Sequence, residues 1–98
     1  MQLRDALSRV QKHDKSITTY FNEVKSLSDI LMSIGEPLRP AEFSAYLMAG
    51  LDGDYDALVA LVGARAATDP MSVQDIYAQL LSTEQHVEAR RAKLGADM

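Results

Sequence analysis

The chain has 98 residues and a formal net charge of −4, with 47% hydrophobic and 24% charged residues. These proportions are ordinary for a small globular protein, and the length allows one modest hydrophobic core. The absence of cysteine excludes disulfides and thiolate metal sites. No apolar run reaches the roughly 18 residues of a membrane-spanning helix, and the charged opening MQLRDALSRVQKHDK is unlike a signal peptide. We therefore expect a cytoplasmic domain with no membrane partner.

Basic side chains are too sparse to predict a nucleic-acid surface. Their only cluster, Arg90, Arg91 and Lys93, lies close to the end of the sequence. Because a phosphate-binding surface needs clustered lysine and arginine, we expect RNA to bind only weakly, or through segments outside these residues.

Apolar residues recur at steps of three and four along nearly the whole chain, which predicts helices and no strands. The first stripe covers about residues 3–12. A longer stripe covers 16–34, where Ser16 is a suitable N-cap residue for the first turn. Gly35 can take the left-handed conformation that ends a helix, so the second helix should stop there.

Three further helices are expected, over about 40–49, 54–66 and 72–91. Pro40 suits a first helical turn, and Gly50 should end that helix. In the next helix the residues expected to face inward include Tyr55, Leu58, Leu61 and Val62. Five short helices with short connections predict an all-α fold, a compact bundle forming a single domain over 1–98.

The stretch MAGLDGDYDAL raises the question of a calcium site, since Asp52, Asp54 and Asp56 alternate with single residues. An EF-hand loop needs glycine at its sixth position and glutamate at its twelfth. Counted from Asp52, those positions hold Ala57 and Gly63. The pattern therefore favours a helix junction in which aspartates cap the following helix.

No set of residues predicts catalysis. The sequence has no cysteine nucleophile, no Gly-x-Ser-x-Gly elbow and no glycine-rich phosphate loop, and His13 and His86 stand far apart without metal-ligand spacing. We expect no enzyme activity, no cofactor, no metal and no small-molecule substrate.

Glu84 is the one charged residue on or beside an apolar stripe, following Leu80 and Leu81. One interpretation is a flanking position whose carboxylate reaches water. The other is a half-buried carboxylate paired with Arg65 or Arg39, which would set how the last helix docks.

Three stretches in fixed order resemble the Gag polypeptide of copia-type LTR retrotransposons of the plant kind. These are YFNEVKSLSDIL followed by GEP, then GLDGDYDALV, and then LLSTEQHVE. The resemblance covers about residues 3–90 and departs at Asp52 and Gly53, where the family often carries proline. The matching junction and final motif comprise Gly50, Leu51, Tyr55, Asp56, Leu80, Leu81 and Glu84.

The resemblance implies an all-helical capsid region of a protein that assembles a virus-like particle around element RNA. The sequence lacks the tryptophan-bearing upstream segment and the downstream zinc knuckle of that family. We therefore expect the C-terminal half of the capsid region, a retroviral-capsid-like C-terminal lobe, either excised or surviving as a shortened relative.

The leading hypothesis is a structural self-association module that forms a homodimer or a higher capsid-like oligomer through apolar helix faces. Exchange of a terminal helix between two copies is one route. The expected contacts lie on the first or the last helix: Leu3, Leu7, Val10, Ile76, Leu80 and Val87.

The alternative is a domesticated, Gag-derived adaptor that binds a helix or peptide of another protein in a groove. Flexible methionine side chains suit such a lining. The candidates are Met32, Met48 and Met71.

Overall fold

The computed structural model describes residues 2–96, so residues 1, 97 and 98 of the expected domain lie outside it. The described part contains helices and no strand, which confirms the prediction of an all-α fold with about five helices. None of these helices is both long and apolar enough to cross a membrane. The elements are α1 (Gln2–Arg9), α2 (Ile17–Ser33), α3 (Pro40–Ala49), the short 3₁₀ helix η1 (Gly53–Tyr55), α4 (Asp56–Arg65) and α5 (Val73–Ala96).

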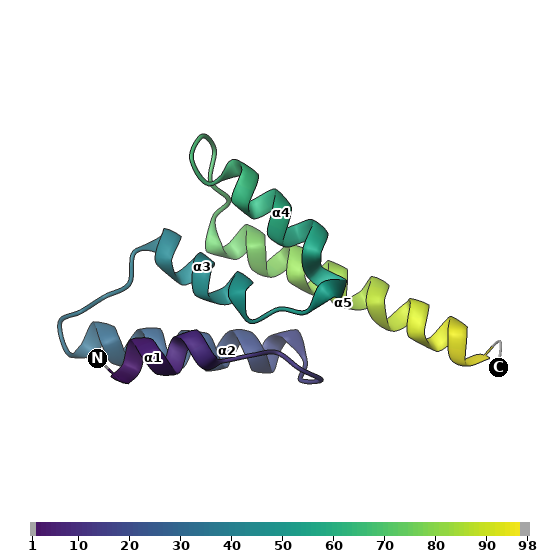
Figure 1. The fold of residues 1–98 in the computed structure, drawn as a ribbon, viewed down its shortest axis with the longest axis horizontal. Coiled ribbons are helices and arrows are strands. Elements are labelled where there is room, and N and C mark those ends of the chain that lie inside the picture. The colour runs from purple at the N-terminus through teal and green to yellow at the C-terminus, as the bar shows by residue number, and fades with distance from the viewer. Residues whose placement is uncertain (1, 97–98) are drawn as a thin grey trace.

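The helices form two antiparallel pairs with α3 between them (Figure 1). The pair α1 and α2 lies on one side, and the pair α4 and α5 lies on the other. Both α3 and α4 pack against α5. The far end of α5 projects beyond the other helices, so the molecule measures 52 × 29 × 18 Å.

The ends of α2 follow local sequence signals. The Ser16 hydroxyl accepts a hydrogen bond from the Thr19 backbone amide at 3.1 Å, which caps the first turn. At the other end Gly35 has a φ of +82°, and the Glu36 amide donates to the Leu31 carbonyl at 2.9 Å. This is the glycine-dependent helix ending expected from the sequence.

Two helix ends differ from the sequence prediction. The first helix stops at Arg9, before residue 12, because the Lys12 backbone amide donates to the Gly50 carbonyl at 2.9 Å and draws the chain toward the end of α3. The last helix continues to Ala96, beyond the expected end near Arg91. The alanine, lysine and leucine that follow Arg91 are all good helix formers.

One core joins all five helices. Leu7, Tyr20, Leu47, Leu58 and Leu80, one from each helix in order, are buried together. Removing a side chain of this size from water contributes about 1.5 to 3 kcal/mol, so each helix is held mainly by its apolar face.

Gly50 ends α3, but for a different reason from the one expected. Its φ of −92° is open to any residue. A Cβ atom there would collide with the Tyr20 hydroxyl and the Val10 carbonyl. Since the Tyr20 hydroxyl also donates to the Leu47 carbonyl at 2.7 Å, glycine is needed where α1, α2 and α3 meet.

Candidate interaction surface

The six residues expected at a contact surface belong to the interior of the chain. Leu3 and Val10 are half-buried against the core. The other four are 6% exposed or less: Leu7, Ile76, Leu80 and Val87. In this conformation the four buried side chains are unavailable to a second copy, because five short helices need these stripes to build the core, whereas Leu3 and Val10 keep part of their surface exposed.

Exposed apolar residues occur at the end of α2 (Ile30, Met32 and Ile34), near the end of α5 (Leu94) and along α4. From Ala57 to Ala64 the sequence has eight apolar residues in succession, yet only Leu58 and Val62 are buried. Leu61, expected to face inward, has 44% of its surface exposed. A helix that is apolar on every side is normally covered. The exposed residues Ala57, Ala60, Leu61, Gly63 and Ala64 form what we call the α4 surface.

An apolar groove of about 560 Å³ lies beside this surface, between α3 and α4. Its lining is mostly small or apolar side chains, and a Cβ on Gly63 would meet nothing within 4 Å. Met48 and Met71 line the groove, as the adaptor hypothesis expected, whereas Met32 is 60% exposed near the end of α2.

The α4 surface lies between charges of opposite sign. Asp56 stands in the first turn of α4 and Arg65 in the last. The Arg65 guanidinium donates to the Asp69 carboxylate at 2.8 Å and to the Asp69 carbonyl at 2.9 Å. The helix is therefore acidic at its start and apolar in the middle, and the positive charge of Arg65 at its end is paired with Asp69.

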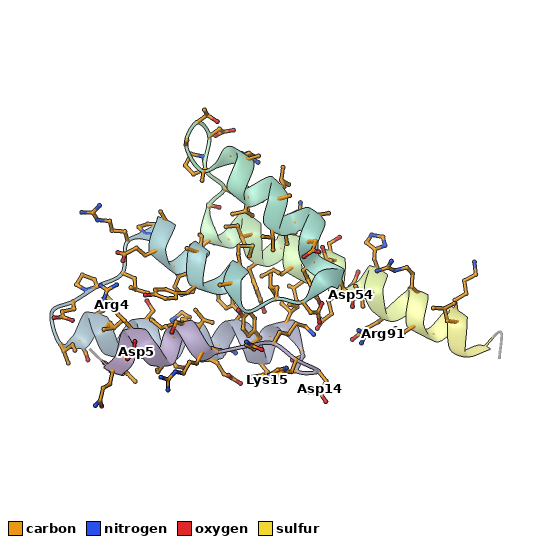
Figure 2. The ribbon with its side chains drawn as sticks, in the orientation of Figure 1. Arg4, Asp5, Asp14, Lys15, Asp54 and Arg91 are labelled. Carbon is orange, nitrogen blue, oxygen red and sulfur yellow. The ribbon has the colours of Figure 1, made fainter. Side chains whose placement is uncertain are left out.

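The alternating aspartates form the junction between α3 and α4. Asp52 caps η1 by accepting from the Asp54 amide at 3.0 Å. The Asp54 carboxylate pairs with Arg91 of α5 at 2.9 Å, and Figure 2 shows the two side by side where α5 leaves the other helices. Within residues 2–96 no group of three or more acidic, histidine or cysteine side chains is placed to hold a metal ion.

Glu84 takes neither of the two roles considered for it. Its carboxylate accepts a hydrogen bond at 2.7 Å from the backbone amide of Ile17, the first residue of α2. Arg65 is bonded to Asp69 instead. Glu84 does set how the last helix docks, but its partner is a free helix amide and not an arginine.

Tyr55 lies in the core, near the charge of Glu84. Its side chain is 2% exposed, and the ammonium of Lys12 lies 5.6 Å from the centre of its ring. Burial, followed by the nearby negative charges of Glu84 and Asp52, raises the pKa of Tyr55 to about 12. The residue is a structural anchor for η1.

No protein-family model matches the chain, and no curated protein or solved structure matches it either. The fold and surface describe a small all-α domain that exposes an apolar helix beside an apolar groove. The likeness to Gag remains a prediction carried by the three sequence stretches quoted above.

Proposed function

We propose that this protein is a structural self-association module and that two copies pair through the α4 surface. The observation that carries the proposal is the run of eight apolar residues on α4, most of them exposed, beside an open apolar groove. Contiguous exposed apolar surface of this kind marks protein contacts in soluble proteins.

The charges of α4 favour a second copy as the partner. In an antiparallel pair of α4 helices about a two-fold axis, the acidic start of each helix lies beside the end of the partner helix, and the reverse approach forms by symmetry. Alanine and glycine allow the two backbones to approach closely, and the two Leu61 side chains pack against each other. One uncharged patch bounded by opposite charges thus complements itself.

The resemblance to Gag also supports self-association. Gag proteins of the copia type assemble into a virus-like particle, and their capsid region is all-helical, as this chain is. We propose that the domain acts as a capsid-like lobe in the cytoplasm, where pairing of α4 surfaces is one contact of the assembly.

The test compares Leu61→Asp with Leu94→Asp, a matched change at the 65% exposed leucine on the projecting end of α5. Light scattering is measured from micromolar to millimolar concentration. We expect a larger association state for the wild type and Leu94→Asp than for Leu61→Asp, because an aspartate cannot be buried at the pairing centre without a partner. A monomeric wild type throughout, or equal loss in both variants, rules the proposal out.

Met48 and Met71 in the groove favour the adaptor as the second candidate function. A groove lined by flexible methionines suits an amphipathic helix of another protein. Methyl NMR signals of the methionines distinguish the two. With self-association the Met71 signal moves as concentration rises while exposed Met32 stays fixed. With the adaptor function the chain stays monomeric, and Met71 moves only when a purified partner is added in stoichiometric amount.

A further inference from the structure

The first segment of the chain, residues 2–12, is docked against α2 and α3. We call this segment the N-terminal arm. Leu7 is its fully buried anchor at 1% exposed. The guanidinium of Arg4 donates to the Glu42 carboxylate at 2.9 Å, and the Lys12 amide donates to Gly50 of α3. These contacts join the arm to α2, α3 and their flanks. Lys12, itself only 8% exposed, also lies over the ring of Tyr55.

The arm is joined to α2 by a tight turn with an unfavourable backbone. The Lys15 amide donates to the Lys12 carbonyl at 2.9 Å, which closes a turn over His13 and Asp14. His13 has a φ of +49° and is the only non-glycine residue with positive φ among residues 2–96. The left-handed region is disfavoured for residues with a Cβ atom, and such turns usually place glycine or asparagine there.

The arm and the rest of the chain carry opposite net charge. The arm has three basic side chains and one acidic, whereas the remaining sequence has seven basic and thirteen acidic. Arg4 already meets Glu42 across this boundary. The arm is therefore attracted to the body of any copy, its own or another.

The geometry points to reciprocal exchange of the N-terminal arm between two copies of this chain. The turn at His13 opens, each arm docks on the partner's α2 and α3, and every contact described above re-forms between chains. The exchange releases the disfavoured backbone of two His13 residues, while the buried surface of Leu7 is retained. This contact is separate from the α4 surface, and two different two-fold contacts on one chain extend an assembly beyond a dimer.

The direct test places one cysteine in each of two chains. Because the native sequence has no cysteine, only the introduced residues can be cross-linked. A chain with Arg4→Cys and a chain with Glu42→Cys are unfolded, mixed, refolded together at high concentration and treated with a short bismaleimide. We expect a covalent heterodimer of the two chains. The double variant Arg4→Cys/Glu42→Cys, refolded at high dilution, serves as the control and should cross-link within one chain.

Efficient cross-linking of that control, with no product from the two mixed chains, overturns the exchange and leaves the α4 proposal untouched. The mixed-chain experiment is repeated with Leu61→Asp in both chains. An unchanged yield supports exchange, because α4 is not involved. Loss of the product in that background assigns the cross-link to α4 pairing and overturns the exchange.

The hinge provides a second readout at an exposed residue, so folding is not at risk. We measure dimerisation in the Leu61→Asp background, where α4 pairing is absent. His13→Gly removes the backbone penalty of the closed turn and should weaken the exchanged dimer about tenfold, whereas His13→Val should strengthen it. His13→Asn should change little. Equal dimerisation by the glycine and valine variants contradicts the role of the turn.

Discussion

The carboxylate of Glu84 in α5 accepts a hydrogen bond from the backbone amide of Ile17 in α2 at 2.7 Å. The two residues are 67 positions apart in the sequence. The amide is one of the free donors in the first turn of α2, where a negative charge also meets the positive end of the helix dipole. Ser16, the residue before α2, caps a second of these donors, so the start of this helix is held both locally and by the last helix.

Replacement of Glu84 should therefore destabilise the fold although it makes no ion pair in the described residues. We expect Glu84→Ala to lower the free energy of unfolding by about 1 to 2 kcal/mol, since it leaves a half-buried amide without an acceptor. Glu84→Gln keeps a carbonyl acceptor and should lose roughly half as much. Urea denaturation provides the measurement, with exposed Glu88→Ala as control. Equal values for Glu84→Ala and Glu88→Ala contradict the capping role.

The features that the sequence predicted well are those set by neighbouring residues. Ser16 and Gly35 act on the turn beside them, so their effect on α2 is visible in the sequence. The partner of Glu84 and the early end of α1 depend instead on contacts between distant segments. Nothing beside Arg9 signals that Lys12 will bond to Gly50 of α3, and so the helix was expected to run further.

The burial of the expected contact residues and the exposure of α4 were not visible in the sequence for a related reason. The apolar stripes of the first and last helices were correctly recognised, but a stripe cannot show whether it faces the chain's own core or a second copy. In α4 the sequence defines no apolar stripe at all, because eight apolar residues in succession leave no side of the helix distinct from the others. The direction of Leu61 follows only from how α4 packs on α5.

Gly50 should tolerate no side chain. We expect Gly50→Ala to lower the free energy of unfolding by about 2 to 3 kcal/mol, because the added methyl group displaces the Tyr20 hydroxyl and the Val10 backbone. Gly63→Ala is the matched control. Gly63 lies within α4 and an added Cβ atom meets no other atom within 4 Å, so this variant should raise the free energy of unfolding by about 0.5 to 1 kcal/mol. Thermal and urea unfolding of both variants check this, and a neutral Gly50→Ala would show that the three-helix contact can relax.

Acid should weaken the contact between α1 and α3 through Glu42. The Arg39 backbone amide and then the Arg4 guanidinium, both donating to this carboxylate, hold the pKa of Glu42 below its ordinary value of 4.5. A lowered pKa in the folded state means that the stabilising effect is complete above pH 4.5 and is lost as pH falls through the folded value. We expect Glu42→Gln to have a flatter decline of stability below pH 4.5 than the wild type. Glu36→Gln, in the exposed connection before α3, should decline like the wild type.

Alkali should destabilise the core through its buried tyrosines. Burial raises the pKa of Tyr20 from 10.0 to about 12, and that of Tyr55 to the same value. Because the unfolded chain loses these protons near pH 10 and the folded chain does not, stability is full below pH 10 and falls as pH rises toward 12. For each tyrosine the fall is on the order of 2 to 3 kcal/mol at most.

Tyr20→Phe separates this ionisation from the hydrogen bond that the hydroxyl makes. At neutral pH the variant should be less stable by about 1 kcal/mol, because the Leu47 carbonyl loses its donor. Between pH 10 and 12 its stability should fall less steeply than that of the wild type, so the two curves converge and then cross. Denaturation at several pH values, with tyrosinate absorbance followed in parallel, gives both quantities. If the stability of the wild type and of Tyr20→Phe fell in parallel across this range, the ionisation of Tyr20 would not contribute to the loss of stability.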